Sequence, residues 1–176
     1  MNKIFLIGYM GAGKTTLGKE LANRLNTPLI DTDLFIENRY RKSISDMFAE
    51  HGESGFREIE RKILYEIADF EDVVVATGGG MPCFFDNMDC MNRAGKTVYL
   101  QVPEEELAAR LYLLKRTRPL IKNKTQDEIR QFIAETLNFR EKWYLQAQVV
   151  FPVYQMNNRA EVRRLANELI EKLEIQ

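Results

Sequence analysis

Short apolar runs alternate along this chain with longer stretches in which apolar side chains recur at helical spacing. The runs are brief and β-branched, which is typical of strands that are buried on both faces. The longer stretches place apolar residues three and four positions apart, as amphipathic helices do. We expect strands over 3–7, 28–31, 72–76, 97–102 and 149–153, and helices over 15–25, 55–70, 104–114, 125–144 and 161–173.

The order of these elements predicts an α/β fold with three layers. Strands that alternate with helices form a parallel sheet with helices on both faces, here a sheet of five strands. A chain of 176 residues can bury one core but is too short for two large domains. We therefore expect a single domain over residues 1–176, without internal repeats or linkers.

Composition narrows the functional classes. The chain carries 25 basic and 26 acidic residues, so its net charge of -1 predicts neither a nucleic-acid nor a membrane partner. No stretch approaches the roughly 20 apolar residues of a membrane span. Cys83 and Cys90, with His51 as the lone histidine, are too few for a structural zinc site. Two free thiols suggest a cytoplasmic protein.

The strongest motif follows the first expected strand directly. Residues 8–15 read GYMGAGKT and fit the phosphate-loop pattern G-x-x-x-x-G-K-[ST], with a helix expected next. Glycines let the backbone turn tightly and point its N–H groups at phosphate oxygens. Lys14 would reach the β- and γ-phosphates, and Thr15 would offer its hydroxyl to Mg²⁺. The expected nucleotide-binding residues are Gly11, Ala12, Gly13, Lys14, Thr15 and Thr16.

A phosphate loop alone does not distinguish a kinase from a GTPase or an ATP-driven motor. The strand expected at 72–76 ends in Thr77 and three glycines, where such proteins usually carry a metal-binding aspartate. The guanine-reading motif Asn-Lys-x-Asp only begins at 123–126. Two carboxylates, Asp31 and Asp33, instead end the second strand, where open α/β sheets bind ligands. This placement suits a metal and a substrate together.

Here the chain resembles the shikimate kinases, small-molecule kinases similar to the nucleoside monophosphate kinases. Five motifs occur in the family's order: the phosphate loop, Asp31-x-Asp33, Phe56-Arg57-x-x-Glu60, Thr77-Gly78-Gly79-Gly80 and Arg118-Pro119-Leu120-Ile121. Together they span nearly the whole chain. The resemblance implies transfer of the γ-phosphoryl group of ATP to the 3-hydroxyl of shikimate, in the route to chorismate and the aromatic amino acids.

The resemblance also implies residue roles. Asp33 would hold the ring hydroxyls and is the candidate base, while Asp31 would face Mg²⁺ through water. Arg57 and Arg140 would bind the shikimate carboxylate, although Arg140 lies in an Arg-x-Lys-x-Tyr segment where many members have proline in the middle. The glycines Gly78, Gly79 and Gly80 would approach the acceptor with bare backbone.

The residues themselves leave alternatives open. Arg57 and Glu60 are three apart on a helix, so the carboxylate could orient the guanidinium. Without the family pattern, the charges at Arg57, Glu58, Glu60 and Arg61 favour a solvated helix face, and it is the family pattern that favours a binding role for Arg57. The three glycines could likewise form a flexible turn.

The segment 115–124 is rich in basic residues and has little helical periodicity, so we expect a mobile basic lid. By resemblance, Arg118 would close over the phosphates and act in catalysis with Lys14 and Asp33, whereas Arg116 has no assigned role. The family packs around adenine near Asn157, Asn158 and Arg159, but these residues match it loosely. The alternatives are another small-metabolite kinase, of the gluconate or nucleoside monophosphate type, and a non-catalytic nucleotide-binding module. We expect a monomer.

Overall fold

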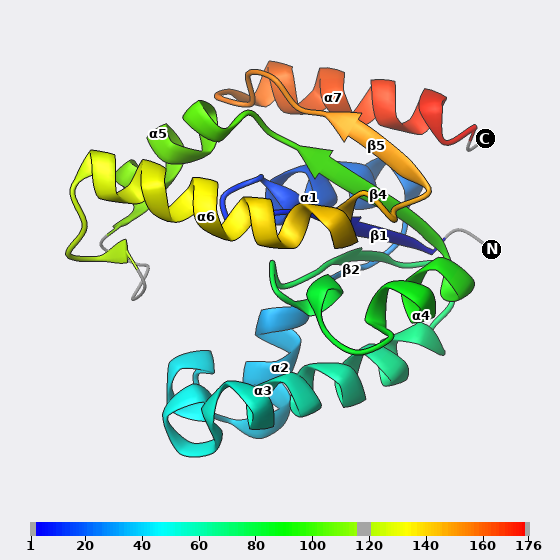
Figure 1. Ribbon diagram of the computed structural model, residues 1–176. Coiled ribbons are helices and arrows are strands. Elements are labelled where there is room, and N and C mark those ends of the chain that lie inside the picture. The colour runs from blue at the N-terminus through cyan, green and yellow to red at the C-terminus, as the bar shows by residue number, and fades with distance from the viewer. Residues whose placement is uncertain (1–2, 116–120, 175–176) are drawn as a thin grey trace.

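The computed structural model describes residues 3–115 and 121–174, and shows five parallel strands in one sheet (Figure 1). The strand order is β2-β3-β1-β4-β5, which confirms the predicted fold class. Each expected strand is present within two residues of its predicted bounds. The strands are β1 (Ile4–Ile7), β2 (Leu29–Asp31), β3 (Val74–Ala76), β4 (Lys96–Gln101) and β5 (Val149–Pro152).

The central strand β1 explains why the chain begins with a continuous apolar run. It pairs with β3 on one side and β4 on the other, with Ile4 opposite Val74 and Lys96. All four residues of β1 are fully buried. A strand covered on both faces has no solvent side, so it needs apolar residues at consecutive positions.

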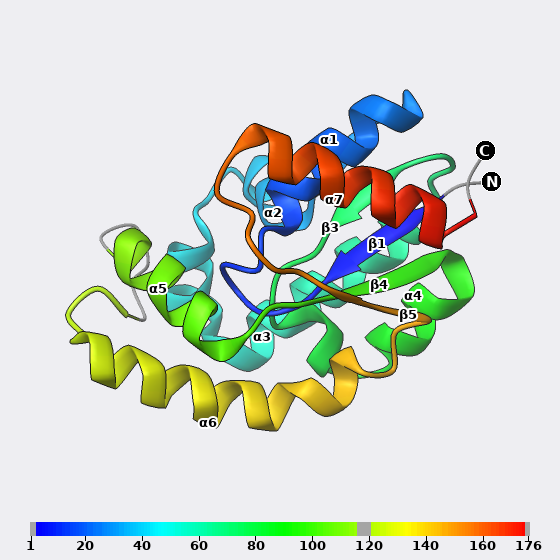
Figure 2. The same cartoon turned by 90° about the horizontal axis from the view of Figure 1, so that it is seen from above.

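Helices cover both faces of the sheet. α1 and α7 lie side by side on one face, and α3 and α4 lie on the other (Figures 1 and 2). α5 packs against α6 at the end of the molecule where the strands terminate. The helices are α1 (Lys14–Leu25), α2 (Thr32–Tyr40), α3 (Ile44–Ala68), α4 (Asn87–Ala94), α5 (Glu104–Leu114), α6 (Gln126–Tyr144) and α7 (Arg159–Lys172), with a 3₁₀ turn η1 (Met81–Cys83).

The sequence analysis missed two helices and half of a third. α2 shows little of the apolar periodicity that identifies a helix, and α4 has only eight residues, too few for its pattern to stand out in the sequence. α3 starts at Ile44, eleven residues before the expected helix, because Ser43 caps it by accepting a hydrogen bond from Asp46 N at 3.0 Å. Gly52, at φ 67° and ψ -179°, kinks the helix in its first half.

Parallel pairing brings the segments after every strand to the same edge of the sheet. This edge therefore holds the phosphate loop after β1, Asp31 and Asp33 at and just after the end of β2, and the glycine run after β3. Residues 116–120 lie outside the described part of the chain, and with them Arg116, Arg118 and the middle of the expected lid. Within residues 3–115 and 121–174, no helix is long and apolar enough to cross a membrane.

Candidate active site

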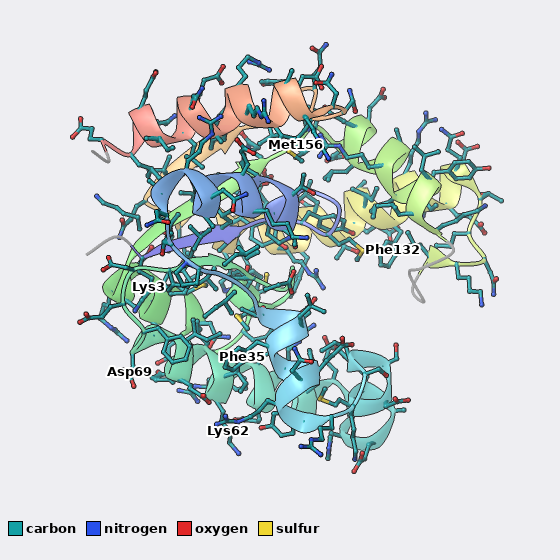
Figure 3. All side chains as sticks on the ribbon, turned by 180° about the vertical axis from the view of Figure 1, so that it is seen from behind. Lys3, Phe35, Lys62, Asp69, Phe132 and Met156 are labelled. Atoms are coloured by element: carbon teal, nitrogen blue, oxygen red, sulfur yellow. The ribbon has the colours of Figure 1, made fainter. Side chains whose placement is uncertain are left out.

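An open pocket of about 460 Å³ lies at this edge of the sheet. Its walls come from the phosphate loop, the end of β2, the glycine run, the last turn of α5 and the segment before α7. Met156 closes the pocket beneath the start of α7 (Figure 3). The lining residues are Met10, Gly11, Gly13, Lys14, Thr15, Thr16, Asp31, Asp33, Thr77, Gly78, Gly79, Arg110, Leu113, Leu114, Met156 and Asn157.

The phosphate loop requires glycine for two separate reasons. Gly13 adopts φ 93° at the N-cap of α1, a left-handed conformation that other residues rarely take. At Gly8 a Cβ would also lie 2.9 Å from the carbonyl oxygen of Leu100 on the neighbouring strand. The loop therefore wraps the positive end of α1, which favours an anion at that position.

Lys14 and Thr15 lie at the base of this loop. The buried Lys14 ammonium donates hydrogen bonds to the carbonyl oxygens of Gly8 at 2.8 Å and Tyr9 at 2.9 Å. The Thr15 hydroxyl donates to Asp31 Oδ2 at 2.6 Å. These contacts place one cation, one hydroxyl and one carboxylate around the start of α1.

Asp31 links this group to Asp33 and the start of α2. Its second oxygen, Oδ1, caps α2 by accepting from Asp33 N at 3.1 Å and Leu34 N at 3.3 Å. Asp33 therefore lies in the first turn of α2 rather than on the strand end where the sequence analysis placed it. The cap fixes the spacing between the two carboxylates.

The glycine run passes directly beside Asp33 and the buried pair on α3. A Cβ on Gly78 would lie 2.7 Å from Asp33 Oδ1 and 3.1 Å from Glu60 Oε1. A Cβ on Gly80 would lie 2.6 Å from a terminal nitrogen of Arg57. At two of the three positions a Cβ would therefore displace the Asp33 carboxylate or the Arg57 guanidinium, so the run is more than a flexible turn.

Arg57 is buried, which rules out the solvated-face interpretation for it and for Glu60. Its guanidinium pairs with Glu60 at 2.5 Å and with the exposed Glu53 at 3.2 Å. The Phe84 ring lies 4.3 Å from its central carbon, a cation–π contact. Glu58 is exposed, as expected for a surface position on the same helix.

The electrostatic surroundings of Glu60 show that Arg57, Asp33 and Arg140 all lie near it. Burial raises the pKa of its carboxyl to about 7, although Arg57 beside it favours the charged form. The charge of Asp33 raises this pKa further, and that of Arg140 lowers it. Arg140, half-buried on α6, has its guanidinium carbon 6.0 Å from the centre of the Tyr9 ring. The structure thus gathers both arginines and Asp33 around one buried carboxylate.

The sequence analysis missed Arg110, which braces the phosphate loop. It donates to the carbonyl oxygens of Gly11 at 3.2 Å and Ala12 at 3.3 Å, and pairs with Glu106. On an amphipathic helix this arginine looks like any solvent-facing residue, so no local signal identifies it. Met156 contacts the same loop, since its methyl group occupies the space of a Gly13 side chain.

The residues considered for adenine separate in the structure. Asn157 lines both the main pocket and a neighbouring pocket of about 470 Å³ between α1 and α7, whereas Asn158 and Arg159 line the neighbouring pocket alone. The Asn158 side chain caps α7 by accepting from Glu161 N at 3.0 Å. Asn158 is therefore occupied as a helix cap.

Comparison with known proteins gives a consistent result. The sequence profile of the shikimate kinase family matches residues 10–174. A shikimate kinase from Parabacteroides distasonis is 53% identical over 173 residues, covering 98% of this chain and all of that protein. The crystal structure of a Bacteroides thetaiotaomicron shikimate kinase is 49% identical, with a TM-score of 0.96 and 99% coverage of each chain. A shikimate kinase from Acinetobacter baumannii in complex with shikimate is 32% identical, with a TM-score of 0.86 over 99% of this chain and 93% of that one.

The pKa of Glu60 generates a prediction about stability. Its carboxyl titrates near 4.5 when unfolded and near 7 when folded. The stabilisation that Glu60 adds to the free energy of unfolding is therefore complete below pH 4.5 and is lost as the pH rises through 7. The free energy of unfolding changes by up to about 1.4 kcal/mol per pH unit in this range. In urea unfolding from pH 4.5 to 8, Glu60→Gln should lack this slope.

The exposed residue Glu58 supplies the control for this unfolding experiment. Glu58→Gln should keep the wild-type dependence of unfolding free energy on pH, because Glu58 lies on the same helix but in water. Equal slopes for the wild type and Glu60→Gln would show that Glu60 is not the buried titrating group.

Proposed function

The chain belongs to the shikimate kinase family and is an ATP-dependent kinase that phosphorylates shikimate; we propose that the pocket at the sheet edge carries out this reaction. The γ-phosphoryl group of ATP passes to the 3-hydroxyl, giving shikimate 3-phosphate and ADP for aromatic amino acid biosynthesis. The observation that carries the proposal is the buried Arg57–Glu60 pair beside Asp33, which itself lines the same pocket as a complete phosphate loop. We further propose that the reaction takes place in the cytoplasm.

The phosphate loop would hold ATP. Backbone N–H groups from Gly11 to Thr16 surround the start of α1, where the helix dipole favours phosphate oxygens. Lys14 would leave its two carbonyl partners for the β- and γ-phosphates, so its charge would oppose the charge that develops on the transferred group. Arg118, outside the described residues, stays our candidate for a second cation there.

The residues around Asp31 fit a magnesium ion. Mg²⁺ takes oxygen ligands and keeps several waters, so it binds to one or two protein groups together with substrate phosphates. The Thr15 hydroxyl and Asp31 Oδ2 are 2.6 Å apart at the phosphate loop and are both oxygen donors. The described residues contain no group of three or more His, Cys, Asp or Glu side chains that could hold a metal alone. When bound, the ion would neutralise phosphate charge, with Thr15 as a direct ligand and Asp31 acting through water.

The acceptor would lie between Asp33 and the two arginines. Arg57 and Arg140 supply the cationic groups for a carboxylate, and charge-assisted hydrogen bonds to a buried guanidinium are the strong class. Asp33 would accept hydrogen bonds from the ring hydroxyls and align the attacking oxygen, with the proton leaving to this carboxylate. Gly78, Gly79 and Gly80 leave space for the sugar-like ring beside these groups.

The first test concerns the reaction itself. Wild-type protein with Mg²⁺ and ATP should release ADP only when shikimate is added, in a coupled ADP assay that also includes gluconate and AMP. Lys14→Ala should lower kcat by roughly 100-fold or more, because it removes a charge that acts in the transition state. Lys62→Ala, at an exposed position on the far side of α3, should change nothing (Figure 3). ADP release with gluconate or AMP instead of shikimate would overturn the assignment.

The second test separates the two aspartates. Asp33→Asn should reduce kcat more than it weakens ATP binding, because an amide cannot take the proton. Asp31→Asn should instead raise the Mg²⁺ concentration required, and excess Mg²⁺ should restore part of its activity by mass action. A magnesium titration of both variants at saturating ATP and shikimate measures this. Rescue of Asp33→Asn by metal would mean that the two roles are exchanged.

The third test uses the close approach at Gly80. A Cβ there would press on the Arg57 guanidinium, which is also confined by Glu60 and Phe84. Gly80→Ala should therefore raise KM for shikimate about tenfold or more, as expected when a charge-assisted hydrogen bond is lost. KM for ATP should stay within about twofold of the wild-type value. An equal rise in both constants would indicate general damage to the pocket.

A further inference from the structure

The backbone N–H groups of the glycine run have different partners. Gly78 N donates to the Thr32 hydroxyl at 2.8 Å, so it is occupied within the protein. No hydrogen bond from the N–H of Gly79 or Gly80 is found within the described part of the chain. Gly80 is buried whereas Gly79 is half-buried, and buried N–H groups are rarely left unpaired, so the Gly80 N–H is the candidate for binding the acceptor.

Tyr144, the last residue of α6, contacts this run through Gly79. Its side chain is fully buried, and its hydroxyl donates to the carbonyl oxygen of Gly79 at 2.6 Å. The Tyr99 ring packs against the Tyr144 ring with centroids 5.2 Å apart. Burial raises the pKa of Tyr144, so the hydroxyl keeps its proton and stays a donor.

This contact controls the direction of one N–H group. The carbonyl of Gly79 and the N–H of Gly80 belong to the same peptide unit, which is trans and planar. In a trans peptide these two groups point in opposite directions. Tyr144, by holding the carbonyl, therefore turns the Gly80 N–H away from α6.

The residues beside the Gly80 N–H indicate which ligand group it would bind. The terminal nitrogens of Arg57 lie 2.6 and 2.7 Å from the position that a Cβ on Gly80 would occupy. An anionic group bound by Arg57 therefore comes next to the Gly80 backbone. A carboxylate has two oxygens, and an N–H donor beside a guanidinium can satisfy the second.

We propose that Tyr144 is a positioning residue for the acceptor: through Gly79 it orients the Gly80 N–H toward the carboxylate that Arg57 binds. The inference rests on shikimate being the acceptor. Tyr144 need not touch the substrate, since its hydrogen bond to Gly79 acts through one peptide plane; the same hydroxyl also lies near Arg140.

Removing a single oxygen atom tests this role, and the chain supplies a matched control. Tyr144→Phe should raise KM for shikimate about tenfold, the cost of one misaligned hydrogen bond to a charged group. KM for ATP should stay within about twofold. Tyr99→Phe removes a hydroxyl from the adjoining ring, whose partner is Glu141 at 3.4 Å, and should leave both constants within about twofold.

A measurement on the wild type keeps the proposal testable even if the variant does not fold. In ¹H–¹⁵N spectra, saturating shikimate should move the Gly80 amide proton downfield, because it becomes a donor to a carboxylate. The Gly78 amide, already bonded to Thr32, should move less. In folded Tyr144→Phe the downfield shift at Gly80 should shrink.

Several results would overturn the proposal. These are an unchanged KM for shikimate in Tyr144→Phe, an equal rise in KM for ATP, an equal effect of Tyr99→Phe, or no downfield shift at Gly80. Failure of the proposed function looks different, because wild-type protein would then release no ADP with shikimate. An active wild type with a Tyr144→Phe variant of unchanged KM contradicts only the role of Tyr144.

Discussion

Parallel pairing of the five strands is the constraint on which the site depends. Because all strands run the same way, every following segment starts at one edge of the sheet. The phosphate loop after β1, the two aspartates after β2 and the glycines after β3 thus meet, although they are separated by many residues. The residues that we propose for the nucleotide and for the acceptor share this edge, and the Asp31 carboxylate connects the two groups by touching Thr15 and capping α2.

The proposed acceptor site is built around a buried ion pair. Taking a guanidinium and a carboxylate out of water costs more than their attraction commonly returns, so a pair such as Arg57–Glu60 is weak evidence for stability. Here its surroundings explain it better as part of a binding site. Phe84 and the backbone at Gly80 confine the guanidinium, and the pKa of about 7 at Glu60 reflects the desolvation. A charge held this rigidly is ready for an anionic ligand.

Glycine serves two different purposes in the pocket. In the phosphate loop, Gly13 is needed for a backbone conformation that side chains disfavour. In the glycine run, Gly78 and Gly80 have ordinary φ angles but lie against Asp33 and Arg57, so it is space that excludes a Cβ. A glycine pattern in the sequence does not distinguish these causes, and only the second brings the glycine backbone against Asp33 and Arg57.

The sequence by itself determined the strands and most helices, because local periodicity indicates them. It also determined the phosphate loop and the family resemblance, because these rest on motifs of fixed spacing. Only the tertiary structure decided that Arg57 is buried rather than solvated, that Arg110 braces the phosphate loop, and that Tyr144 holds Gly79. Each of the last two contacts joins residues far apart in the chain: Tyr144 and Gly79 are 65 positions apart. Such contacts depend on how helices pack on the sheet, and local sequence patterns carry no information about which side chains that packing will bring together.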